Sequence, residues 1–243
     1  MEKVPENIKK ITAEFLENVR EAFAENLLSV ILYGPAARGE TGKTPYINFM
    51  VVVTDNTPSE LARCSSFVKK WNKHLITTPL FLDPDYIQQS LDTFPLEFLN
   101  MSTSYIVVYG ENFLEDLDFK VSEVRSQCER ELKGKLLHLR AEYLNLRGDK
   151  KGLMDLVDRS LNTFRLIFTG ALFLKNIEIP KEINILFNIV TEEYDLDILL
   201  FKKLISIANG ELKMDEKDAD ELFDLYVEEL DKLSNAIDEM SDL

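Results

Sequence analysis

The residues of this chain best suited to chemistry lie in a loop between two short apolar runs. The runs, Leu27–Tyr33 and Ile47–Thr54, are rich in valine, isoleucine and leucine, and they predict two β-strands. The loop between them holds three glycines, two prolines and a single arginine, Arg38. A guanidinium group matches the geometry of a phosphate, so Arg38 is a candidate phosphate contact; the alternative is a surface ion pair with Glu40.

The stretch from Leu27 to Asp55 resembles the signature of the nucleotidyltransferase superfamily, the DNA polymerase β-like or minimal nucleotidyltransferase fold. In that family a strand ends in Gly-Ser, a loop close to Arg-Ala-Arg-Gly-Glu follows, and the next strand opens with Asp-x-Asp. Here Gly34 ends the first strand, and Ala37-Arg38-Gly39-Glu40 matches the loop. The resemblance implies that the two aspartates hold Mg²⁺, which bridges the phosphates. It also implies a set of nucleotide-binding residues: Gly34, Pro35, Arg38 and Gly39.

The sequence departs from this signature where the metal chemistry resides. Pro35 replaces the serine and supplies neither a hydroxyl nor an N–H donor. Tyr46 and Asn48 stand where the two aspartates are expected, and Lys43 to Val53 contains no acidic residue. A third carboxylate usually lies on a later strand, where this chain has Leu80 and Leu82. Four other carboxylates remain as candidates for the lost charge: Asp83, Asp85, Asp92 and Glu97.

The flanking pattern predicts an α+β fold, with a small mixed-sheet nucleotidyltransferase-like domain over residues 1–118 and an all-α helical bundle over residues 119–243. Residues 57–60 (Thr-Pro-Ser-Glu) predict a capping box that opens a helix to about His74. Ile76–Leu82 predicts a third strand, in which Pro79 indicates an edge or a bulge. Asp83 is a predicted helix cap. After Asp118 the strand signals stop, and apolar residues at spacings of three and four predict a helix from Val121 to Leu146.

The overall charge restricts the partners. The net charge is −15, from 28 basic and 43 acidic residues, which disfavours nucleic acid and anionic membranes. Two distant cysteines and two histidines make a zinc site improbable. We expect a cytoplasmic protein without a signal peptide or a membrane span, and we leave a homodimer open.

Two functional hypotheses follow. The first is a catalytically degenerate nucleotidyltransferase-like protein that acts as a binding or regulatory module, with a nucleotide or a protein as its partner. The alternative is an active metal-dependent nucleotidyltransferase, acting on a small molecule, a protein or RNA, in which the four remaining carboxylates replace the lost pair.

Overall fold

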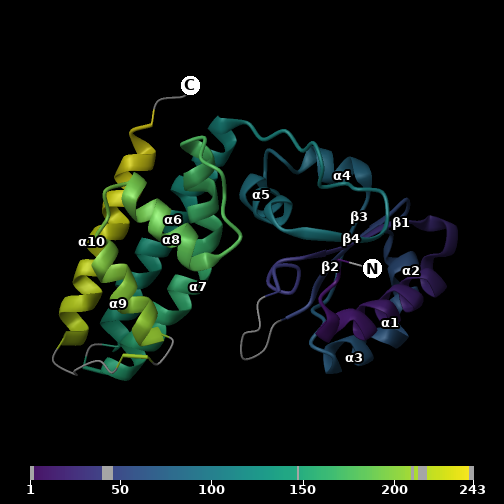
Figure 1. The fold of residues 1–243 in the computed structure, drawn as a ribbon, viewed down its shortest axis with the longest axis horizontal. Helices are drawn as coiled ribbons and strands as arrows, with labels where there is room; N and C mark the ends of the chain where they lie inside the picture. Colours follow the sequence, from purple (N-terminus) through teal and green to yellow (C-terminus); the bar gives the residue numbers. More distant parts are fainter. Residues whose placement is uncertain (1–2, 40–45, 147, 209–210, 213–217, 241–243) are drawn as a thin grey trace. The chain divides into compact units, whose positions relative to one another are not determined.

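A computed structural model describes residues 3–39, 46–146, 148–208, 211–212 and 218–240 of the chain. The chain divides into two compact units, Met1–Phe119 and Lys120–Leu243. Within the described residues, the first unit holds all the strands and the second is built of helices (Figure 1).

The first unit contains a small mixed sheet. Its described strands are β1 (Leu27–Tyr33), β2 (Asn48–Val53), β3 (Leu80–Leu82) and β4 (Tyr105–Gly110). They lie in the order β3-β2-β1-β4, so the two strands predicted on either side of the loop are the central pair. β1 is antiparallel to both β2 and β4, whereas β2 and β3 are parallel.

Helices cover both faces of this sheet. Because side chains alternate along a strand, Val30 and Leu32 point to one face, and Ile31 and Met50 point to the other. The first face packs against α1 (Glu6–Phe23) and α3 (Ser65–Lys73), and the second against α4 (Pro84–Gln89) and α5 (Pro95–Thr103). Figure 1 shows α1 and α3 below the sheet and α4 and α5 above it. The alternating apolar residues of each strand therefore form two separate cores.

The predicted helix start is confirmed, with Thr57 as the N-cap residue and Pro58 in the first turn, but the predicted capping box does not form. The segment forms a short helix, α2 (Pro58–Leu61), and a 3-10 turn (Ala62–Cys64) before α3 begins. The Thr57 side chain makes no capping hydrogen bond to α2. The Glu60 carboxylate instead pairs with the Arg63 guanidinium at 2.7 Å, so the second half of the predicted box has a different partner.

The predicted third strand is mostly irregular. β3 covers only Leu80–Leu82, and an isolated parallel bridge joins Ile76 to Ile47 four residues earlier. Pro79 lies between the two pairings, and because proline has no backbone N–H, it interrupts the ladder on what is an edge strand.

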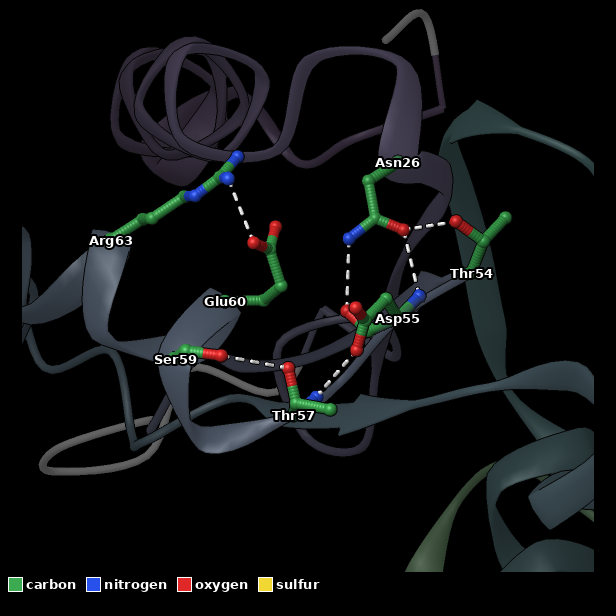
Figure 2. A network of polar contacts seen from close by, with 7 residues as sticks. All are labelled: Asn26, Thr54, Asp55, Thr57, Ser59, Glu60 and Arg63. Carbon is green, nitrogen blue, oxygen red and sulfur yellow. Dashed lines mark hydrogen bonds and ion pairs between the residues drawn. The ribbon is translucent and has the colours of Figure 1, made fainter.

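A polar network ties the start of β1 to the end of β2 (Figure 2). The Asn26 side chain donates to the Asp55 carbonyl at 2.9 Å and accepts from the Asp55 N–H at 2.7 Å. Its Oδ1 also accepts from the Thr54 hydroxyl. The Asp55 carboxylate in turn accepts from the Thr57 N–H at 2.9 Å, which fixes the turn that leads into α2. This end of the sheet is held by side chains as well as by strand pairing.

The second unit is a helical bundle, which confirms the predicted fold class of a small mixed sheet followed by helices. Its described helices are α6 (Val121–Leu146), α7 (Lys150–Leu174), α8 (Ile183–Glu193), α9 (Ile198–Ala208) and α10 (Ala219–Asp238). The bounds of α6 are those that the spacing predicts. Tyr226 is buried in the bundle core, and its hydroxyl lies 2.6 Å from the Ser160 hydroxyl. No described helix is long and apolar enough to cross a membrane.

Candidate functional site

The loop that opens after β1 begins with a tight turn at Gly34. Gly34 has φ = +74°, a conformation that side chains disfavour. Its carbonyl accepts the N–H groups of Ala37 and Arg38, at 3.1 and 3.2 Å. Pro35 follows Gly34 and contributes no N–H. The half-buried Arg38 lies in this turn, whereas Glu40, Lys43 and the rest of segment 40–45 lie outside the described residues.

Asn48 begins β2 directly opposite the end of β1. It pairs with Tyr33, so the two side chains point to the same face of the sheet. The Asn48 Oδ1 accepts a hydrogen bond of 2.9 Å from the Thr77 hydroxyl. The Asn48 Nδ2 lies beside the turn, because a Cβ added to Gly34 would come within 3.0 Å of it. The Asn48 amide fits beside the turn because Gly34 has no side chain.

Thr77 reaches Asn48 because the chain before β3 runs parallel to the start of β2. The Ile47 N–H donates to the Leu75 carbonyl at 3.0 Å, and the Thr77 N–H donates to the Ile47 carbonyl at 3.1 Å. This register points Thr77 to the same face as Asn48. The sequence suggested Leu80 and Leu82 for this third position, but those residues pair with Met50 and Val52, further along β2.

The residue type alone gave no indication of Thr77, since a threonine in a β-rich run is ordinary. The one indication in the sequence was that the predicted third strand, Ile76–Leu82, begins at Ile76. If that strand runs parallel to β2 from its start, its second residue, Thr77, lies near the start of β2. Only the parallel pairing of Ile47 with Ile76, seen in the structure, shows that Thr77 lies beside Asn48.

Two tyrosines are close to Asn48, one in the chain and one in the strand pairing. Tyr46 precedes β2 and is 59% exposed. Burial raises the pKa of the half-buried Tyr33 hydroxyl above its ordinary value, so Tyr33 stays protonated at neutral pH. Neither side chain is a carboxylate, so neither replaces the aspartate that the resemblance implies.

Asp83 and Asp85 lie at the opposite end of the sheet from Asn48. Leu82 pairs with Val52, so Asp83 follows level with the end of β2. Val53 at that end lies five positions along β2 from Asn48, which is about 16 Å at roughly 3.3 Å per strand residue. The Asp83 carboxylate caps α4 by accepting the Tyr86 N–H at 2.8 Å, as predicted, and it also accepts the Asn56 amide at 3.1 Å. Asp85 lies in the first turn of α4.

The other two candidate carboxylates lie on the segments between β3 and β4. Asp92 is exposed, and its carboxylate accepts the Thr93 hydroxyl at 2.9 Å. Glu97 is half-buried in the first turn of α5. Neither is joined to Asn48 by a hydrogen bond, since the Asn48 side chain bonds only to Thr77 within the described residues.

Comparison with known proteins bears on the fold. Neither models of protein families nor curated proteins match the sequence. Among solved structures, the chain is similar to spectinomycin adenyltransferase AAD(9) from Enterococcus faecialis, crystallised with ATP and spectinomycin. The match has a TM-score of 0.53 and 15% sequence identity, and it covers 93% of this chain and 99% of that one.

This chain has a nucleotidyltransferase-like fold. The likeness extends over both units, because it covers nearly the whole of each chain. At 15% identity the likeness concerns the fold alone.

The described residues at this end of the nucleotidyltransferase-like sheet do not fit Mg²⁺. A magnesium site needs carboxylates or phosphates to supply negative charge. Asn48 and Thr77 offer neutral oxygens, and those oxygens are hydrogen-bonded to each other. Nowhere in the described part of the chain do three or more histidine, cysteine or acidic residues gather so that they could hold a metal ion.

Proposed function

We propose that this chain is a catalytically degenerate nucleotidyltransferase-like protein, which acts as a binding or regulatory module through the end of the sheet formed by Gly34, Asn48 and Thr77. It transfers no nucleotidyl group.

One observation carries this proposal: the hydrogen bond between Thr77 and Asn48. The resemblance puts metal-binding aspartates at Tyr46 and Asn48, and the fold puts Thr77 against Asn48 from the third segment. A neutral hydroxyl and a neutral amide therefore satisfy each other where a metal would need negative charge. The loss of charge affects three neighbouring positions and not one isolated residue.

ATP is the first ligand to test, because the neighbour with the same fold was crystallised with ATP. We propose that Gly34, Pro35, Arg38 and Gly39, which form the turn after β1, lie against the nucleotide. Arg38 is the residue of this turn with the right chemistry for a phosphate, since its guanidinium is planar and always charged.

The test is a pyrophosphate-release assay with ATP and Mg²⁺ or Mn²⁺, with and without spectinomycin as the acceptor. We expect wild-type protein to release no more pyrophosphate than the matched variant Arg38→Ala. Metal-dependent release that Arg38→Ala abolishes would overturn the proposal. In that case, Asp92→Asn and Glu97→Gln would identify which carboxylate replaces the lost pair.

A further inference from the structure

The Asn48 amide has a defined orientation. Its Oδ1 accepts the Thr77 hydroxyl at 2.9 Å, so its Nδ2 is turned away from Thr77 and toward the Gly34 turn. Within the described residues, no acceptor bonds to that Nδ2. The side chain therefore presents two N–H donors beside the turn.

With this orientation, residue 48 presents hydrogen-bond donors to the turn, where an aspartate would present only acceptors. A carboxylate at residue 48 would present acceptors only, would attract a cation and would repel a phosphate. An amide N–H instead donates to an anionic oxygen directly. Hydrogen bonds of neutral donors to charged acceptors are stronger than neutral pairs, so this donor favours an anionic ligand.

Three groups whose position relative to Asn48 is defined are compatible with an anion: Tyr33, Asp83 and Arg38. Tyr33, opposite Asn48, stays protonated because burial raises its pKa. Asp83 lies at the far end of β2, on the cap of α4. Arg38 adds a positive charge to the turn itself.

We propose that this site binds the phosphate groups of a nucleotide directly, without a bridging divalent cation, and that the Asn48 amide is the donor. Thr77 is a positioning residue, which holds the amide so that Nδ2 faces the turn. This inference rests on the proposed function, since it names the ligand chemistry of the same site.

The proposal predicts that Mg²⁺ weakens binding. Magnesium occupies the phosphate oxygens of ATP, and the site offers no carboxylate to hold the ion in exchange. A metal-dependent site would behave in the opposite way.

The experiment is calorimetric titration of ATP and of inorganic triphosphate into the full chain, in EDTA and in excess Mg²⁺. Four proteins are compared: wild type, Asn48→Asp, Thr77→Val and Asn72→Asp. Asn48→Asp should fold normally, because its carboxylate still accepts the Thr77 hydroxyl. Asn72, exposed on α3, controls for the added charge.

We expect wild type to bind both ligands in EDTA and more weakly in Mg²⁺. Asn48→Asp should lose about ten- to a hundredfold in affinity, the range for a lost hydrogen bond to a charged group. Thr77→Val should lose less, about three- to tenfold, because the amide remains but turns freely. Asn72→Asp should bind as wild type does.

Three results would overturn the inference: ATP binding only with Mg²⁺, equal binding by wild type and Asn48→Asp, or no binding of either ligand. None of these three binding results would demonstrate nucleotidyl transfer, so the proposed non-catalytic function would still stand. Metal-dependent pyrophosphate release is the separate result that would remove the proposed function.

Discussion

The two ends of the sheet in the first unit are built from different chemistry. At one end, Asn26, Thr54 and Asp55 form several mutual hydrogen bonds. Asp83 lies at the same end, because Leu82 pairs with Val52 near the end of β2, and its carboxylate caps α4. At the other end, a single hydrogen bond joins Thr77 to Asn48. The carboxylates of Asp55 and Asp83 also accept backbone N–H groups at the first of these ends, which is remote from the candidate site. Asp83 therefore does not belong to the candidate site, although it directly follows the third strand in the sequence.

The largest expected difference between the ends comes from their glycines. A Cβ at Gly110, where φ is +75°, would lie 1.8 Å from the Leu28 carbonyl oxygen. Gly110→Ala should therefore cost at least about 3 kcal/mol, because left-handed strain and a backbone clash add. Gly34→Ala should cost about 1–2 kcal/mol, since the Asn48 side chain can move aside. Urea unfolding followed by the fluorescence of Trp71, the chain's one tryptophan, measures both. If Gly34→Ala and Gly110→Ala lowered the free energy of unfolding equally, the expected difference between the two ends of the sheet would be wrong.

The asparagines give the next contrast. Asn26→Ala removes three hydrogen bonds and should destabilise the first unit by about 2 kcal/mol. Asn48→Ala removes one and should cost about 0.5–1 kcal/mol. The same fluorescence assay distinguishes them. A larger cost for Asn48→Ala than for Asn26→Ala would show that the site end contributes more to stability than its contacts indicate.

Restoring charge should create a metal site at the neutral end. Tyr46→Asp combined with Asn48→Asp places two carboxylates two residues apart, on one face of the extended chain. We expect the double variant to bind Mn²⁺ at least about tenfold more tightly than wild type, because two fixed charges now attract the ion. Titration calorimetry measures the affinity, and each single variant is the control. If the double variant gains nothing over the single ones, the geometry of this end and not its charge is what excludes metal.

The smallest effect is expected at the Asp83 cap. Asp83→Ala should cost about 1 kcal/mol, the usual cost of losing an N-cap, in the same urea assay. It should leave ATP binding unchanged, because Asp83 lies about 16 Å along the strand from the level of Asn48. Asp83→Asn, which keeps a capping oxygen, is the matched control. Weaker ATP binding by both variants would mean that Asp83 contributes to the site.

Short-range patterns in the sequence determined a large part of this protein. The apolar runs placed β1 and β2, the three-four spacing gave α6 its bounds, and Asp83 was predicted as a cap. The sequence also shows directly that positions 46 and 48 carry Tyr46 and Asn48 and no aspartate, because this is a matter of residue type. Such features depend on interactions within a few residues, and a local pattern is enough to predict them.

Only the tertiary structure decided which residues meet at the site. The parallel pairing of Ile47 with Ile76 brings Thr77 to Asn48, and the continuing register carries Asp83 to the other end of β2. The predicted capping box failed for a local reason instead, because Glu60 pairs with Arg63 three residues later and the Thr57 N–H donates to Asp55 two residues earlier. Strand register is set by packing between segments far apart in the chain, and a shift of one residue turns every side chain to the opposite face.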